Sequence, residues 1–137
     1  MTIEDKIKQF KAEVGSRTLT PEQGKLYYAF TKKNGKDVKI NVVDSYGVAL
    51  RVTVESSKEV RKILAKHYRT GNGTVTAMQI LNMFDTVRTG EKYSSQGNTV
   101  YRKTRSKDGV AYHTVVKIFG NGHDAVLKSF YSTIGYK

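Results

Sequence analysis

The stretch "TVYRKTRSKDGVAYHTVVKIFGNGHDAVLKSFYST", Thr99 to Thr133, has the pattern of a three-stranded antiparallel meander. Its three runs are rich in Val, Tyr, Thr and Phe, which are common in strands. The turns between them, "SKDG" and "GNGH", contain an Asp-Gly and an Asn-Gly pair, and these pairs are strong hairpin signals. The stretch therefore predicts a sheet of consecutive antiparallel strands.

The two turns also suggest a register for these strands. We pair Arg105 with Tyr112 and Thr114 with Ser129, because alternate side chains of a strand share a face. The predicted polar face then holds Tyr101, Lys103, Arg105, Tyr112, Thr114, Ser129, Tyr131 and Thr133, and it continues into apolar Val116, Ile118 and Leu127. The opposite predicted face holds Arg102, His113, Val115, Lys117, Val126, Lys128 and Phe130.

The predicted polar face combines cations, hydroxyls and tyrosine rings. Cations and hydroxyls bind phosphate oxygens, and aromatic rings stack on bases, so this combination suits a phosphodiester chain. A solvent-facing sheet of ordinary composition is the alternative that the spacing leaves open.

Upstream of the meander the pattern is mostly helical. Residues 2–15 and 18–30 predict two helices that begin at Thr2 and Thr20, and Pro21 suits a first helical position. Residues 37–43 and 47–54 predict a hairpin turning at "DSYG", followed by a helix that Ser56 or Ser57 caps and a short helix within "VTAMQILNMF". We expect "DTVRTG" to be a strand or extended turn and "EKYSSQGN" a polar loop.

Together these elements predict an α+β fold. N-terminal helices and a β-hairpin precede a helix pair that packs on a C-terminal antiparallel meander. The length of 137 residues suits a single domain over residues 1–137, with residues 37–137 as the core. Residues 1–36 are expected to be a helical cap or the surface that meets a partner.

Net charge is the strongest global signal. The chain has 24 Lys and Arg against 12 Asp and Glu, which gives +12. Residues 1–68 and residues 69–137 each contribute +6, so the excess is not confined to one tail. A balance of this kind favours a polyanionic partner, most commonly a nucleic acid.

Several classes of protein are disfavoured. The chain has no cysteine, which excludes disulfides and thiolate zinc sites, and its three histidines form no metal-binding motif. We expect no metal and no cofactor. No apolar run has the length of a membrane span, and "MTIEDKIKQF" does not have the pattern of a signal peptide.

A metal-independent ribonuclease fits these limits, because RNA carries its own nucleophile, the 2′-hydroxyl. Such an enzyme needs a base, a donor set for the phosphate charge and an acid for the leaving oxygen. His67, on the apolar stripe of its predicted helix, is the candidate base, although a structural histidine is the plainer interpretation. Arg88 is a candidate phosphate contact or a surface ion-pair residue. We assign His113 a structural role and His123 a turn role.

The order of elements resembles a known superfamily. The segments "VTVESSKEVRKILAKH", "AMQILNMFDTVRTG", "VYRKTRSKDGVAYHTVVKIF" and "AVLKSFYST" carry the resemblance. It is to the barnase–EndoU–colicin–RelE superfamily of metal-independent ribonucleases, particularly its phage-associated and polymorphic-toxin branches. The sequence departs from branches with a histidine at each end of the helix, because Glu59 and Val60 occupy the upstream positions.

The resemblance implies an endoribonuclease toxin or effector that cleaves RNA, often tRNA, to a 2′,3′-cyclic phosphate in a bacterial cytoplasm, with delivery from outside as one route. It implies an acidic immunity or antitoxin protein as a partner. The catalytic candidates are His67, Arg88, Arg102, Ser129, Tyr131 and Thr133, and the RNA-binding candidates are Lys103, Arg105, Tyr112, Thr114 and Lys128.

Two other classes stay open. A non-catalytic nucleic-acid-binding protein would use the same basic, tyrosine-rich sheet and would bind in a salt-dependent way without cleavage. A basic phage protein that inhibits a host complex would bind one defined partner and have little affinity for bulk RNA.

Overall fold

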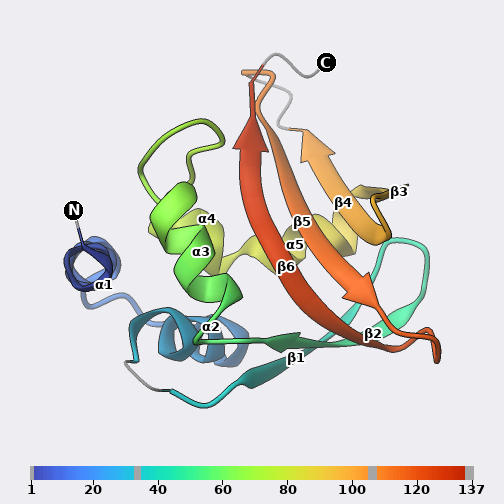
Figure 1. Ribbon diagram of the computed structural model, residues 1–137, viewed down its shortest axis with the longest axis horizontal. Coiled ribbons are helices and arrows are strands. Elements are labelled where there is room, and N and C mark those ends of the chain that lie inside the picture. Colours follow the sequence, from blue (N-terminus) through green and yellow to red (C-terminus); the bar gives the residue numbers. More distant parts are fainter. Residues whose placement is uncertain (1, 33–34, 105–107, 135–137) are drawn as a thin grey trace.

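The computed structural model describes residues 2–32, 35–104 and 108–134 (Figure 1). Within these ranges the helices are α1 (Ile3–Val14), α2 (Pro21–Thr31), α3 (Glu59–Lys66), α4 (Ala77–Leu81) and α5 (Met83–Thr89). The strands are β1 (Val38–Val43), β2 (Ala49–Val54), β3 (Glu91–Ser95), β4 (Asn98–Thr104), β5 (Ala111–Ile118) and β6 (Asp124–Thr133). The predicted α+β class is confirmed.

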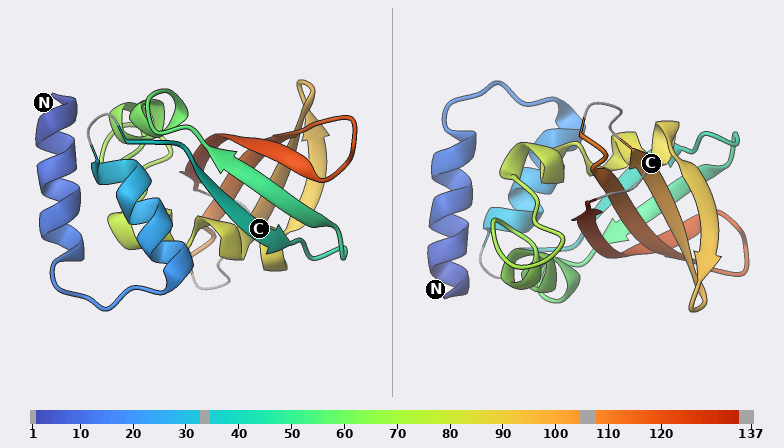
Figure 2. Two further views of the ribbon diagram at one scale, coloured as in Figure 1. Left: turned by 90° about the horizontal axis from the view of Figure 1, so that it is seen from below. Right: turned by 90° about the horizontal axis from the view of Figure 1, so that it is seen from above.

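All the described strands belong to one sheet, in the order β1-β2-β6-β5-β4-β3. Neighbouring strands are antiparallel except β2 and β6, which run parallel. Helix α5 contacts β4 and β5 and also β1 at the far edge, so the sheet must curve around this helix (Figures 1 and 2). We call the side of the meander that faces α5 the inner face, and the opposite side the outer face.

The N-terminal helices begin as the sequence predicts. Thr2 and Asp5 form a reciprocal capping box at α1, and Thr20 and Gln23 form another at α2. Such boxes satisfy backbone donors that a helix leaves unpaired at its start. The apolar side of α1 then packs through Phe10, whose ring stacks on Phe30 of α2 at 5.7 Å. One buried apolar cluster runs from these helices to β6.

The predicted register of β5 and β6 is correct only near their turn. Ile118 pairs with Ala125, and Val116 with Leu127, as expected. A β-bulge then shifts the register by one residue, so that Thr114 pairs with Phe130 instead of Ser129. Because side chains alternate, a shift by one residue moves the rest of β6 to the other face. Lys128 is the extra residue.

This shift corrects the predicted faces. Tyr101, Tyr112 and Thr114 do share the inner face, since β4 and β5 differ from the predicted register by two residues. Phe130 joins them on the inner face and is buried. The hydroxyls predicted to lie beside them, those of Ser129, Tyr131 and Thr133, lie on the outer face with Arg102 and His113.

Three local expectations are also wrong. Helix α3 begins after Lys58, which makes no side-chain cap, rather than at a serine. The segment "DTVRT" belongs to helix α5, and "EKYSS" forms edge strand β3, which pairs with β4. Among the described residues, no helix is long and apolar enough to cross a bilayer.

Candidate functional site

A row of polar and aromatic side chains crosses the outer face of the meander. Glu91 pairs with Arg102, Arg102 with His113, and His113 with Tyr131, on β3, β4, β5 and β6 in turn. Residues directly opposite one another on antiparallel strands have neighbouring side chains. His67, at the end of α3, continues the row beyond β6. We call these five residues the outer-face row.

The rings of the outer-face row are in contact. The His113 and Tyr131 rings are stacked, with centroids 4.8 Å apart and planes within 4°. The His67 ring centroid lies 5.6 Å from that of Tyr131, at an interplanar angle of 33°. Tyr131 therefore lies between two imidazoles. At the other end, Arg102 Nη2 donates to Glu91 Oε2 at 2.8 Å.

His67 is held by the loop that follows it. It is the C-cap of α3, and its Nδ1 lies 3.2 Å from the Asn72 carbonyl oxygen. A carbonyl only accepts, so Nδ1 carries the hydrogen and the neutral ring keeps its lone pair on Nε2. Burial lowers the pKa of His67, and the Lys66 charge lowers it further, which outweighs the opposing effect of the Asn72 contact. The ring is therefore a neutral base near pH 7.

Gly73 brings the loop against the row. Its φ of +76° suits glycine, and a Cβ there would lie 3.1 Å from His67 Nδ1 and 3.2 Å from Tyr131 Cβ. Ser132 of β6 donates from its backbone to the Gly73 carbonyl and from its hydroxyl to the Thr74 carbonyl, at 3.2 and 2.7 Å. The loop tip is thus fixed to the strand that carries Tyr131.

His113 was assigned a structural role because the predicted register put it on the opposite face from Tyr131. Its side chain is 2% exposed, so it supports Tyr131 from below rather than reaching a bound molecule. Burial lowers its pKa, and the Arg102 charge lowers it further. The bulge at Lys128 is what places His113 on the same face as Tyr131, and nothing in the sequence around Lys128 predicts a bulge.

The remaining candidates lie in different places. Arg88, on α5, is bound by Glu22 and Asp85, and the structure does not bring it to the row. Thr114 is fully buried and donates to the Met83 carbonyl at 2.9 Å. Tyr112 accepts from Gln79 at 2.7 Å. None of these three joins the outer-face row.

Ser129 and Thr133 flank Tyr131 on the same strand and face and are partly buried. The Thr133 hydroxyl oxygen has no hydrogen-bond partner in the described parts of the chain. Lys103 is exposed at the end of β4, and Arg105 lies outside the described residues. Lys128, the bulge residue, lines an outer-face groove of about 370 Å³ together with Lys117 and Phe119.

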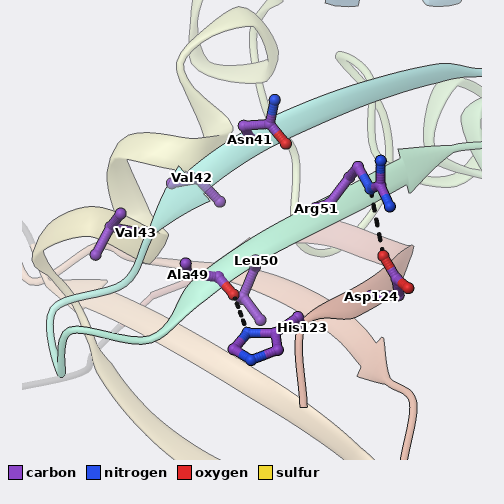
Figure 3. A pocket seen from close by; sticks show the side chains of 8 residues that line it. All are labelled: Asn41, Val42, Val43, Ala49, Leu50, Arg51, His123 and Asp124. Carbon is purple, nitrogen blue, oxygen red and sulfur yellow. Dashed lines mark hydrogen bonds and ion pairs between the residues drawn. The ribbon is translucent and has the colours of Figure 1, made fainter. Parts of the chain in front are cut away.

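A cavity of about 490 Å³ lies elsewhere, between the β1–β2 hairpin and the start of β6 (Figure 3). Three of its polar side chains are engaged within the lining, because Arg51 binds Asp124 at 3.3 Å and His123 donates to the Ala49 carbonyl at 2.9 Å. At about 3.3 Å per residue, Asp124 is roughly 20 Å along β6 from Tyr131. This cavity is separate from the outer-face row.

Over the described residues, no group of three or more His, Cys, Asp or Glu side chains is placed to hold a metal ion. Comparison with protein-family models, curated proteins and solved structures finds no match. The outer-face row is the candidate functional site.

Proposed function

We propose that this chain is a metal-independent endoribonuclease that cuts RNA at the outer-face row. The observation that carries the proposal is the position of His67: its ring is in contact with Tyr131, and its Nδ1 contact with Asn72 leaves the basic lone pair on Nε2. A neutral imidazole beside a phenol provides a base and an acid within one contact distance.

In the proposed reaction, His67 Nε2 takes the proton of a ribose 2′-hydroxyl, and the 2′-oxygen attacks the adjacent phosphorus. The bond from phosphorus to the 5′-oxygen breaks, and that oxygen takes a proton from the Tyr131 hydroxyl. The products are a 2′,3′-cyclic phosphate and a 5′-hydroxyl. Solvent then carries the proton from His67 to the Tyr131 phenolate, which restores both side chains.

Positive charge near the row supports binding of the phosphate chain. Arg102 lies one strand beyond His113, and Lys66 precedes His67 and is exposed. The groove lined by Lys117 and Lys128, together with one acidic residue, Glu55, continues along the same face of β6. These cations extend the row into a basic track, as a single-stranded polyanion requires.

A non-catalytic nucleic-acid-binding protein is the second candidate. It is favoured by the ion pair between Arg102 and Glu91 at 2.8 Å, because a paired Arg102 is less able to stabilise the charge that develops during cleavage, whereas Lys66, Lys117 and Lys128 can still bind backbone phosphates. In this alternative the same surface binds RNA for affinity alone.

Further parts of the proposal follow from the resemblance and the charge. A ribonuclease toxin or effector would act on RNA in a bacterial cytoplasm, with tRNA as the expected substrate. A net charge of +12 would suit an acidic immunity or antitoxin protein that covers the basic face.

The test is incubation of purified protein with total tRNA in EDTA, resolved on a denaturing gel and probed for cyclic phosphate ends. We expect discrete fragments from the wild type and a loss of about 10²- to 10⁴-fold in rate for His67→Ala. His123→Ala is the matched control, because His123 is in the β5–β6 turn, outside the row. Intact RNA with a salt-sensitive gel shift would instead support the non-catalytic protein.

A further inference from the structure

Glu13 of α1 lies behind the loop that holds His67. Its Oε1 accepts from the Tyr68 hydroxyl at 2.6 Å and from Arg69 Nε at 3.1 Å. Its Oε2 accepts from the Ala77 backbone at 2.9 Å and pairs with Arg69 Nη2 at 3.0 Å. A single carboxylate therefore binds both the residues that follow His67 and the first residue of α4.

Two more residues on the same side of α1 contact Tyr68. Lys6 is buried and donates from Nζ to the Tyr68 carbonyl at 2.6 Å, and the Phe10 ring lies 5.4 Å from the Tyr68 ring. The spacing of Lys6, Phe10 and Glu13 places them on one face of the helix. Helix α1 thus contacts the residue next to His67 through its ring, hydroxyl and backbone.

The conformation of the loop between these contacts, residues 69–75, depends on how its two ends are held. Arg69 has a φ of +53°, which is uncommon for a residue with a side chain, and Gly71 and Gly73 also have positive φ. Backbone contacts close the loop between His67 and Val75 and between Arg69 and Val75, at 2.8 and 3.0 Å. The Asn72 carbonyl that binds His67 is at the tip of this loop.

We propose that Glu13 is a positioning residue for His67: by holding both ends of the loop, it fixes where the Asn72 carbonyl stands and therefore which ring nitrogen of His67 carries the hydrogen. Its link to activity rests on the proposed function, whereas its effect on the His67 ring does not. Helix α1 is then part of the site through Glu13 and not only a cap.

The charges at Glu13 agree with this role. Burial tends to raise the pKa of Glu13, but the hydrogen bonds from Arg69, Tyr68 and Ala77 outweigh it, and the net pKa is lowered. Burial raises the pKa of Tyr68, and Glu13 raises it further, so the phenol stays protonated. Glu13 accordingly accepts, and Tyr68 donates, across the neutral range.

A purely structural role would have a different signature. It would lower the stability of the whole chain, but the His67 ring in molecules that are still folded would be unchanged. A positioning role changes the ring itself, because loosening the loop removes its contact with Asn72 and admits water.

The test is nitrogen NMR of the full chain labelled at histidine, compared between wild type, Glu13→Ala and Glu13→Gln. We expect a predominant Nδ1–H form in the wild type and a mixture of ring forms in Glu13→Ala, with the pKa of His67 moving up towards 6.5. Glu13→Gln keeps one oxygen acceptor, so its mixture of ring forms should be intermediate between those of wild type and Glu13→Ala. It replaces the alanine variant in the test if that variant does not fold. Cleavage should fall about 10- to 100-fold in Glu13→Ala.

Glu22→Ala is the matched control, because Glu22 is also a partly buried glutamate paired with an arginine, Arg88, away from the loop. It should leave the His67 signals and cleavage unchanged. If the wild type cuts RNA and Glu13→Ala keeps its His67 signals, the inference is wrong. If Glu13→Ala changes the ring form while the wild type cuts no RNA, the inference stands and the proposed function fails.

Discussion

On the inner face of the meander the Tyr101 hydroxyl donates to the buried carboxylate of Asp44 at 2.7 Å, whereas on the outer face the Tyr131 ring lies between His113 and His67. Both residues are tyrosines on neighbouring parts of one sheet. The hydroxyl of the inner tyrosine is hydrogen-bonded within the fold, and the ring of the outer tyrosine packs between two histidine rings.

This difference depends on one residue. Without the bulge at Lys128, Tyr131 would face inward and Phe130 outward. The candidate chemistry of this chain therefore depends on strand register as well as on which residues are present. If the two faces are assigned correctly, substitutions on the inner face should mainly change stability, and those on the outer face should mainly change cleavage.

The largest effect on stability is expected from Phe130→Ala. Phe130 is 1% exposed and stacks on Tyr112 at 6.3 Å, and removing a buried ring leaves a cavity. The free energy of unfolding should fall by about 3–5 kcal/mol in urea titration. Phe119→Ala removes the same atoms from a ring that is 49% exposed, and a similar loss there would contradict the assigned faces.

Asp44→Asn should come next, lowering the free energy of unfolding by about 1–3 kcal/mol. Burial tends to raise the pKa of Asp44, but hydrogen bonds from Tyr101, Val48 and Tyr46 outweigh it, so the net pKa is lowered. A lowered carboxyl pKa stabilises the fold above the unfolded value of about 3.9 and stops doing so as pH falls through the folded value.

The gap in stability between wild type and Asp44→Asn should therefore narrow in acid. Urea titrations at a series of pH values from 7 downwards measure it. Asp85→Asn, at a carboxylate that is 63% exposed, should show little gap at any pH. A gap that stayed constant to low pH would argue against an ionised Asp44.

Gly73→Ala should affect both stability and cleavage. It should cost about 1–2 kcal/mol for the positive φ, and its new methyl group should also displace His67 or Tyr131 and slow cleavage. Gly97→Ala separates the two causes, because Gly97 has a φ of +79° but open space around its Cβ position. Equal cleavage by the two variants would show that the loop tip does not affect the row.

The smallest effect on stability is expected from Tyr131→Phe, at under about 0.5 kcal/mol, since the stacked ring is kept. Cleavage should nevertheless fall by about 10²-fold or more, because the proposed proton donor is gone. Tyr28→Phe is the control, at an exposed tyrosine of α2 whose hydroxyl accepts from the Lys36 backbone at 3.2 Å, away from the row. If Tyr131→Phe cleaved RNA at the wild-type rate, the Tyr131 hydroxyl would not be the proton donor.

Much of the fold could be predicted because its signals are local. The capping residues Thr2 and Thr20 and the Asp-Gly and Asn-Gly turns act within a few positions, and the structure has the expected helices and hairpins there. The register next to the β5–β6 turn was correct for the same reason, since the turn sets it.

The errors came from tertiary context. The segment around Val87 was predicted to be a strand or extended turn, yet it forms α5, where Phe84 and Val87 are fully buried in the curve of the sheet. Burial of this kind overrides weak local preference. Strand β3 was missed because an edge strand needs no apolar face. Of the candidate residues, His67 and Tyr131 are in contact, whereas Thr114 is buried on the inner face. His113, which the sequence analysis gave a structural role, stacks on Tyr131.

The parallel pairing of β2 with β6 has a consequence for the order of folding. Arg51 and Asp124, partners in this pairing, are 73 residues apart, and long-range strand pairing forms slowly because a large loop must close first. Helices α1 to α3 and the first hairpin contact one another without β6, but only the arrival of β6 brings Tyr131 to His67. During synthesis the nascent chain would therefore have no assembled row until β6 pairs with β2, and the proposed cleavage would begin only after that pairing.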